Sequence, residues 1–229
     1  MRHQEVVTLA KNSSLVLRVK KNGNVFIYLP IEQQVKDILA DEKLYNHLTN
    51  GDMCSSISTG NITDVTSAML YKELITKHSF SENDLSLTWN TDGIPVFSSS
   101  NYSIWPLEAS INGLPPYLRS KNMLLMGLWF GEKPHMNTFL KPFVMECSRL
   151  QNEGFVFSTE PQPRKVVPLL FCGDAPACAI VRNSKQFNGD YGCDWCESSG
   201  VTLRTGDGPP TRYYPYWTPV TMRSGRKQA

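Results

Sequence analysis

Two aspartates, Asp92 and Asp174, directly follow segments whose residue patterns predict β-strands. Asp92 follows LSLTWNT at residues 85 to 91, and Asp174 follows KVVPLLFCG after an intervening predicted helix. A helical crossover between two strands of one sheet makes the second strand parallel to the first, and parallel neighbours lie about 4.8 Å apart. If the two strands are neighbours, both carboxylates reach one edge of the sheet, the usual ligand position in open α/β folds.

Two carboxylates held this close repel each other unless a divalent cation lies between them. Mg²⁺ or Mn²⁺ suits such a site, because these ions take oxygen ligands from carboxylates, waters and phosphates. Two ions about 3.5 to 4 Å apart can activate an attacking hydroxyl and stabilise the leaving oxygen of a phosphodiester. Gly93 is expected to let the chain turn without crowding the ions. The alternative is that Asp92 is a turn residue before Gly93 and Asp174 a helix N-cap before Ala175.

Cys193 and Cys196 in GCDWC have the Cys-x2-Cys spacing that lets two thiolates bind one tetrahedral Zn²⁺. This pair is only half of a zinc site, and no cysteine or histidine follows Cys196 in the sequence. The other ligand candidates, Cys172, Cys178 and His135, contribute only if the fold brings them close. The alternative is a pair of reduced thiols beside a buried Trp195. Six cysteines are too few for a secreted disulfide framework in a chain of 229 residues, so reduced thiols are expected.

The sequence from residue 85 predicts the sheet that would position these residues. Leu85, Leu87 and Trp89 alternate with polar residues, which is the period of a half-buried strand. Further strands are predicted in IPVFSS, in YSIWPLEASI and in the apolar run at 123 to 130, and KVVPLLF is predicted as a central strand covered on both faces. Between them a helix is predicted that ends before Gly154, with apolar residues at steps of three and four: Met136, Phe139, Leu140, Phe143, Val144, Cys147 and Leu150. A further helix is predicted to begin near Ala175, with Pro176 in its first turn.

The first 80 residues predict a β-hairpin followed by helices. SSLVLRV and VFIYLP flank KKNGN, and Asn-Gly between two β-rich segments is a hairpin signal. One helical face is predicted from Ile31 to about Leu48, and a second helix from Ile62 to Lys77 with its apolar residues inward: Val65, Met69 and Leu74. The chain is thus predicted to be α/β, with a mainly helical N-terminal region at 1–80, a core at 81–200 and an irregular tail at 201–229.

Three long blocks of the core resemble the transposase of CACTA-type (En/Spm-like) DNA elements. They are LSLTWNTDGIPVFSSSNYSIWPLEASINGLPPYLR, LLMGLWFGEKPHMNTFLKPFV and LLFCGDAPACAIVRNSKQFNGDYGCDWCE, which occur in that family's order over about residues 80 to 197. The resemblance implies an RNase H-like core with a DDE/DDD metal-binding triad, used for cut-and-paste transposition of DNA. It implies that Asp92 is the first acid and Asp174 the second. In that family a Cys-x2-Cys also follows the second acid, which supports zinc completed by ligands further along the chain.

The resemblance places the third acid on a helix well beyond the cysteine pair, where this sequence has no helical period. Glu197 and Asp207 are the only acids that follow the pair, and neither lies in a recognisable helix. Glu146, on the helix before the second aspartate's strand, is expected to be a solvent-facing charge. The sequence therefore predicts an incomplete, C-terminally truncated core that binds Mg²⁺ weakly and cleaves DNA poorly or not at all. The alternative is a non-catalytic remnant of a mobile element that binds DNA or protein.

The basic residues are scattered and form no helix-turn-helix or zinc-finger reader, so only non-specific contact with the DNA backbone is expected. The aromatic run RYYPYW at 212 to 217 is expected either to stack on unpaired bases or to pack a loop. A formal net charge of only +2 decides nothing about a polyanionic partner. The candidate phosphate-binding cations are Lys20, Lys21, Arg119, Lys121, Lys133, Lys141, Arg164, Lys165, Arg182, Lys185, Arg212, Arg223, Arg226 and Lys227.

No window of the sequence approaches the roughly 18 consecutive apolar residues of a membrane span, and the N-terminus lacks the apolar region of a secretory signal. A nuclear or cytoplasmic protein is therefore expected, with DNA, namely transposon ends, as the partner implied by the resemblance. The oligomeric state stays open, with a homo-oligomer as one alternative. An unrelated α/β hydrolase is set aside, because no Gly-x-Ser-x-Gly elbow occurs and histidine is scarce.

Overall fold

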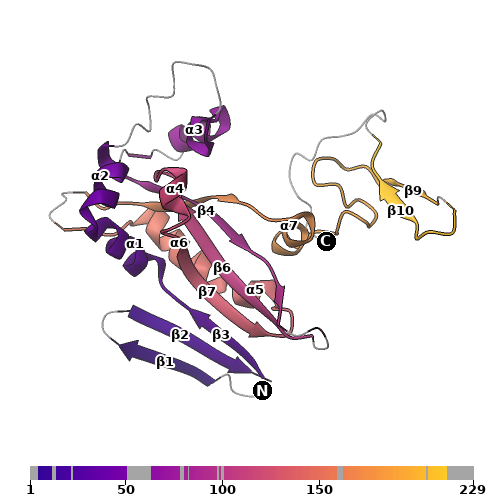
Figure 1. Ribbon diagram of the computed structural model, residues 1–229, viewed down its shortest axis with the longest axis horizontal. Coiled ribbons are helices and arrows are strands. Elements are labelled where there is room, and N and C mark those ends of the chain that lie inside the picture. The colour runs from indigo at the N-terminus through magenta and orange to yellow at the C-terminus, as the bar shows by residue number, and fades with distance from the viewer. Residues whose placement is uncertain are drawn as a thin grey trace. The chain divides into compact units, whose positions relative to one another are not determined.

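The computed structural model of the chain describes residues 5–11, 14–21, 23–50, 63–77, 80–81, 83–96, 98, 101–158, 162–204 and 206–215. Side chains are described from residue 23 onward, residue 50 excepted. The chain forms two compact units, Met1–Phe171 and Cys172–Ala229, which are described separately (Figure 1). The predicted unstructured end, RSGRKQA, lies outside the described residues.

A mixed sheet forms the centre of the first unit. Its described strands lie in the order β1, β2, β3, β7, β6, β4 and β8, and β5 pairs with β6. Neighbouring strands are antiparallel except β4 and β8, which are parallel. The strands span Glu5–Lys11 (β1), Ser14–Lys21 (β2), Asn24–Tyr28 (β3), Leu85–Thr91 (β4), Ile94–Pro95 (β5), Ser103–Ile111 (β6), Leu124–Gly131 (β7) and Val166–Phe171 (β8).

Helices of the first unit pack against this sheet, so that the fold is mixed α/β as predicted. The ring of Phe139 on α5 lies 5.3 Å from that of Phe26 on β3, and the ring of Phe143 on α6 lies 4.9 Å from that of Trp89 on β4. In Figure 1 these two helices lie behind β6 and β7. The helices are α1 (Ile31–Ala40), α2 (Glu42–Asn50), the 3-10 helix η2 (Val65–Ser67), α3 (Met69–Lys77), α4 (Pro116–Arg119), α5 (Met136–Phe139) and α6 (Lys141–Asn152).

The second unit contains one helix and a short hairpin in its described part. Helix α7 spans Ala175–Val181, and β9 (Val201–Leu203) pairs antiparallel with β10 (Thr211–Tyr213). This hairpin lies in a segment whose composition predicted irregular structure. Its strands are only three residues long, and the side chains of β9 are exposed, so no hydrophobic alternation marks it in the sequence.

The core of the first unit follows the predicted periodicities. Alternate residues of β6 are buried, namely Trp105, Leu107, Ala109 and Ile111. Burial of each large aliphatic side chain contributes about 1.5 to 3 kcal/mol to stability relative to its exposure to water. Helix α6 buries Phe143, Cys147 and Leu150 and ends before Gly154, whose φ of +70° confirms the predicted C-cap.

Two predicted helices are interrupted, and each interruption has a capping residue. The expected helix from Ile31 to Leu48 breaks at Asp41, whose carboxylate accepts hydrogen bonds from the backbone N–H groups of Lys43 (2.9 Å) and Leu44 (3.1 Å) and so starts α2. The expected helix from Ile62 to Lys77 is split into η2 and α3. Asp64 caps η2 in a capping box with Ser67.

Three expectations about burial and strand position were wrong. Met69, predicted to point inward, is 78% exposed, and Tyr71 is the buried residue of α3. Val144, predicted on the apolar face of α6, is 54% exposed. The strand KVVPLLF was predicted to be central, but within the described residues β8 has only β4 beside it. Pro168 explains the edge position, because proline lacks the N–H that a strand with two neighbours must donate.

Candidate functional site

The two strands that the aspartates follow, β4 and β8, pair in parallel as predicted. Leu85 of β4 pairs with Val166 of β8, and the register, shifted once between Leu87 and Thr88, ends with Trp89 opposite Phe171. The rings of this last pair lie 4.5 Å apart. Trp89 is therefore held from two sides, by β8 and by Phe143 of α6, and the ends of both strands are fixed to each other.

Asp92 lies in the turn directly after β4 with its side chain exposed. Its Oδ1 accepts a hydrogen bond from the Gly93 backbone N–H at 2.7 Å, which is the turn role considered as the alternative to metal binding. The preceding residue, Thr91, is buried and donates from Oγ1 to the Pro106 carbonyl at 2.7 Å. The carboxylate thus emerges from a turn whose start is fixed to β6.

Gly93 is required at its position by a steric contact that the sequence does not reveal, and its expected role beside metal ions stays a prediction. A Cβ atom at residue 93 would lie 2.5 Å from Cζ2 and 2.6 Å from Cε2 of Trp105. A Cβ atom essentially never makes non-bonded contacts this short, so any larger residue would have to displace the ring or the turn. The crowding that Gly93 avoids is therefore with the indole of Trp105.

Asp174 is the N-cap of α7 in the second unit, and its side chain is exposed. Its Oδ1 accepts from the backbone N–H of Ala177 at 2.7 Å, so the capping role considered from the sequence is confirmed. Pro176 occupies the first turn of this helix, as predicted.

Within the described residues, no hydrogen bond or ion pair engages Oδ2 of Asp174 or of Asp92. An ionised carboxylate has about four lone-pair sites, so these local roles leave each side chain able to bind a cation.

The candidates for a third acid after the cysteine pair lie in the second unit. Across the described ranges, no group of three or more His, Cys, Asp or Glu side chains is placed to hold a metal ion. Glu197 and Asp207 are both exposed, and neither lies in a helix. Asp92 belongs to the first unit and Asp174 to the second, and each carboxylate has a local hydrogen bond there.

Glu146 is not the solvent-facing charge expected from the sequence. Its side chain is only 11% exposed and accepts hydrogen bonds from Tyr28 Oη (2.6 Å) and from the backbone N–H groups of Ile31 (3.0 Å) and Glu32 (3.1 Å). The carboxylate therefore caps the positive N-terminus of α1 from the neighbouring helix α6. Burial, with the charge and hydrogen bond of Glu146, raises the pKa of Tyr28 far above its ordinary value.

The cysteine pair lies in a loop of the second unit, and the expected burial of Trp195 was wrong. Cys193 and Cys196 are half-buried, and the Cys193 Sγ accepts from the Trp195 backbone N–H at 3.4 Å. The Trp195 side chain is 78% exposed, and Asp194 beside it forms an ion pair with Arg182 at 2.9 Å.

The other ligand candidates for zinc have separate environments. Cys172 is an exposed free thiol, and the Cys178 thiol donates to the Gly173 carbonyl at 3.4 Å. His135 is the exposed N-cap residue of α5 in the first unit. None of these residues is part of a metal-binding group within the described residues.

The run RYYPYW packs the loop that leads to the cysteine pair, as far as its described residues 212 to 215 show. The Tyr214 hydroxyl donates to the Gly189 carbonyl and accepts from the Gly192 N–H at 2.9 Å. Arg212 pairs with Asp190 and donates to Thr202 Oγ1 at 3.0 Å. The loop-packing alternative is thus confirmed for Arg212 and Tyr214, while residues 216 and 217 lie outside the described part.

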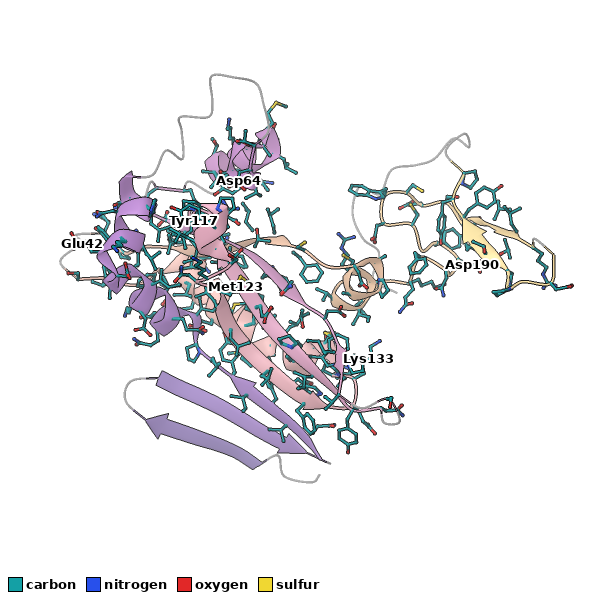
Figure 2. All side chains as sticks on the ribbon, viewed as in Figure 1. Glu42, Asp64, Tyr117, Met123, Lys133 and Asp190 are labelled. Atoms are coloured by element: carbon teal, nitrogen blue, oxygen red, sulfur yellow. The ribbon has the colours of Figure 1, made fainter. Side chains whose placement is uncertain are left out.

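Several of the expected phosphate-binding cations are already engaged within the protein. Arg119 pairs with Asp64, Arg182 with Asp194, and Arg164 is only 1% exposed. The side chains of Lys20, Lys21, Arg223, Arg226 and Lys227 lie outside the described part. Lys165 is half-buried, and the exposed lysines of the set are Lys121, Lys133, Lys141 and Lys185. Figure 2 labels Lys133 in the first unit and Asp190 in the second.

Comparison with protein-family models, with curated proteins and with solved structures finds no match to this chain. Among the described residues, no helix is long and apolar enough to cross a membrane.

Proposed function

We propose that this chain derives from a CACTA-type DNA transposase and that Asp92 and Asp174 are two acids of its metal-binding site. The observation that carries the proposal is the register of β4 and β8, in which Trp89 lies opposite Phe171. Asp92 and Asp174 each follow their member of this pair by three residues. Two acids at equal distances beyond paired parallel strands suit the carboxyl-end ligand position of an α/β sheet.

The proposal includes an RNase H-like core. It is supported by the antiparallel strands β4, β6 and β7, which are followed along the chain by α6 and then by β8 parallel to β4. This is the order of elements that the sequence predicts for the core. The crossover through α6 accounts for the parallel direction of β8.

The donor chemistry of the two acids suits Mg²⁺ or Mn²⁺. Each carboxylate is exposed and uses one oxygen in a local hydrogen bond, so Oδ2 of each can face a hard cation. Such a cation would supply an activated hydroxyl nucleophile and neutralise charge on a phosphodiester. The protein's own part is to hold the two carboxylates in place and to leave room for DNA.

We propose further that metal binding is weak and DNA cleavage slow. The support is that Glu197 and Asp207, the acids that follow the cysteine pair, are exposed and lie outside any helix. The same observation favours a second candidate function, a non-catalytic module that binds DNA or protein. In both cases DNA contact would come from the exposed lysines Lys121, Lys133, Lys141 and Lys185 through the phosphate backbone. A nuclear location and a homo-oligomer belong to the proposal as consequences of DNA transposition.

Zinc is the weaker part of the proposal. Cys193 and Cys196 would provide two thiolate ligands, and the loop that carries them is tied down by Tyr214 through Gly189 and Gly192. A preformed loop lowers the entropy lost when a metal binds. The remaining ligands would have to come from other parts of the protein or from a partner.

Metal binding tests the proposal directly. Mn²⁺ affinity is measured by electron paramagnetic resonance for the wild type, Asp92→Asn, Asp174→Asn and the control Glu132→Gln, an exposed acid of the first unit. Each aspartate variant is expected to bind Mn²⁺ about tenfold more weakly, a change of about 1.4 kcal/mol, and the control to bind like the wild type. Equal affinities in all four proteins would overturn the two-acid site.

Plasmid nicking with Mg²⁺ or Mn²⁺ then separates the two candidate functions. Slow nicking that is lost in both aspartate variants supports the transposase-derived nuclease. DNA binding without nicking, unchanged in both variants, supports the non-catalytic module. Robust nicking that Asp92→Asn abolishes would show that the site is complete and that slow cleavage was the wrong expectation.

A further inference from the structure

The turn that carries Asp92 rests directly on the indole ring of Trp105. The Cβ direction of Gly93 points at this ring, with 2.5 Å to Cζ2, 2.6 Å to Cε2 and 3.1 Å to Nε1. Trp105 is 7% exposed, and its Nε1–H donates to the Ser103 hydroxyl at 2.7 Å, which fixes the orientation of the ring on β6. The ring is therefore a fixed surface against which the backbone at residue 93 lies.

Residues on both sides of Asp92 are anchored to the same strand. Before it, the Thr91 hydroxyl donates to the Pro106 carbonyl at 2.7 Å. After it, Ile94 pairs with Ile104 of β6. The segment between these two anchors is only Asp92 and Gly93, and Trp105 lies between Ile104 and Pro106 on β6. The turn thus contacts three consecutive residues of β6, namely Ile104, Trp105 and Pro106.

We propose that Trp105 is a positioning residue for the Asp92 carboxylate and acts through Gly93. The Gly93 backbone N–H donates to Asp92 Oδ1 at 2.7 Å, so the position of this amide sets the direction of the carboxylate. The ring in turn sets the position of the amide by limiting how far residue 93 approaches β6. The inference rests on the proposed function in one respect: a cation at Asp92 makes the direction of the carboxylate matter.

The geometry distinguishes this role from ordinary core packing. A methyl group on residue 93 would overlap the ring, so the turn that carries Asp92 depends on this one contact. The requirement for glycine is steric, because Gly93 is not among the described residues with positive φ. Replacement of Gly93 and replacement of Trp105 should therefore affect Asp92 through one shared contact.

A double-mutant cycle tests this coupling with Gly93→Ala, Trp105→Leu and the combined variant. Gly127→Ala is the matched control, since a Cβ there meets Phe26 Cε2 of β3 at 3.2 Å and not the Trp105 ring. Each of the two single variants is expected to weaken Mn²⁺ binding by about 10- to 100-fold, the usual loss when a residue that supports a metal ligand is changed. Gly93→Ala should cost much less in the Trp105→Leu background, because the ring that it overlaps is gone. The control should lose stability without losing Mn²⁺ affinity.

Nuclear magnetic resonance provides a readout that does not depend on metal. The exchange rate of the Gly93 amide proton reports the hydrogen bond to Asp92, and it is expected to rise in Trp105→Leu as in Asp92→Asn. The Gly93 Hα resonance is expected to lose its ring-current shift in Trp105→Leu only. Thermal unfolding of every variant identifies any that fails to fold. If one of the two single variants fails, the Gly93 amide of the other single variant is the readout.

The outcomes separate this inference from the proposed function. If the wild type binds no Mn²⁺ at Asp92, the proposed function fails, and exchange of the Gly93 amide alone decides whether Trp105 positions the carboxylate. Additive losses in the cycle, or a Gly93 amide that is unchanged in Trp105→Leu, would overturn the inference even if Asp92 binds metal.

Discussion

Arg119 and Asp64, 55 residues apart in the sequence, form a two-point ion pair in the first unit. Nη1 of the guanidinium donates to Oδ1 at 2.7 Å, and Nη2 donates to Oδ2 at 2.5 Å. Asp64 also caps η2 by accepting from the Val65 N–H at 2.7 Å, and Arg119 donates to the Leu114 carbonyl at 2.6 Å. The pair, labelled at Asp64 in Figure 2, therefore ties the start of η2 to α4, which follows β6.

This ion pair predicts how the stability of the first unit depends on pH. Burial raises the pKa of Asp64, but the hydrogen bonds from Arg119 and Val65 and the Arg119 charge outweigh it and hold this pKa below the ordinary 3.8. A carboxylate with a lowered folded-state pKa stabilises the fold above its unfolded-state pKa and loses this contribution as pH falls through the folded value. We expect Asp64→Asn to lower the free energy of unfolding by about 1 to 3 kcal/mol at neutral pH. Below about pH 4, the free energy of unfolding of this variant should depend less on pH than that of the wild type.

Urea unfolding followed from pH 7 down to pH 2 measures this effect. The matched control is Glu132→Gln, which removes an exposed acid from the same unit. The control curve should run parallel to that of the wild type. A curve for Asp64→Asn that is also parallel to the wild type would show that the ion pair contributes no pH-dependent stability.

The cap that Glu146 provides for α1 predicts a second loss of stability. Glu146→Ala removes the acceptor for the Tyr28 hydroxyl and for the backbone N–H groups of Ile31 and Glu32 at once. We expect the free energy of unfolding to fall by about 2 to 4 kcal/mol, because a charged cap at a helix N-terminus is lost and buried donors stay unsatisfied. Tyr28→Phe removes one of these hydrogen bonds and should cost about 1 kcal/mol.

Hydrogen exchange distinguishes capping from general loosening of the core. In Glu146→Ala the amides of Ile31 and Glu32 should exchange faster than in Tyr28→Phe, while the amides of β6 change only with global stability. Equal protection of these two amides in both variants would contradict a capping role for Glu146.

The parts of this fold that local pattern decides could be predicted from the sequence. The Asn-Gly pair predicted the β2–β3 hairpin, the alternation in 103–111 predicted the buried face of β6, and Gly154 predicted the end of α6. These features depend on residues within a few positions of one another. The capping role of Asp174 belongs to the same class, because its partner Ala177 is three residues away.

The parts that depend on distant contacts could not be predicted in this way. Glu146 looks like any exposed glutamate of a helix until α1 is placed beside it, 115 residues earlier in the chain. Tyr71 is buried with its hydroxyl hydrogen-bonded to Ser86 Oγ at 2.6 Å, and Ser86 lies on the face of β4 that alternation predicted to be polar and exposed. Pro168 is a local signal of the edge position of β8, since a proline within a strand favours the edge of a sheet.

The two cysteines Cys147 and Cys172 predict a difference in thiol reactivity. Burial, with the charge of Glu146, raises the pKa of Cys147 to about 12, so at pH 8 only about one thiol in ten thousand is ionised. Its side chain is also buried, whereas Cys172 is exposed. We expect iodoacetamide to alkylate Cys172 of the native protein while Cys147 stays unmodified until the protein unfolds.

Mass spectrometry of peptides after timed alkylation measures each site separately. Cys172→Ser should remove the fast-reacting site and leave the slow modification of Cys147 unchanged. Similar rates for Cys147 and Cys172 in the native wild type would mean that α6 does not shield the thiol as the structure places it.

Tyr214 and Tyr213 are adjacent in the second unit, and only Tyr214 is bonded to the loop that leads to the cysteine pair. The Tyr214 hydroxyl accepts from the Gly192 N–H at 2.9 Å and donates to the Gly189 carbonyl. Tyr214→Phe leaves the ring in place but removes both hydrogen bonds, at a cost of about 1 to 2 kcal/mol in the stability of the loop. The Gly192 amide should then exchange faster, while Tyr213→Phe should leave its exchange unchanged.

If Zn²⁺ binds the pair, Tyr214→Phe should also weaken that binding relative to Tyr213→Phe, because the loop must then be ordered at the moment of binding. Equal Gly192 exchange in both variants would mean that other contacts, such as the pairing of Arg212 with Asp190, are enough to hold the loop.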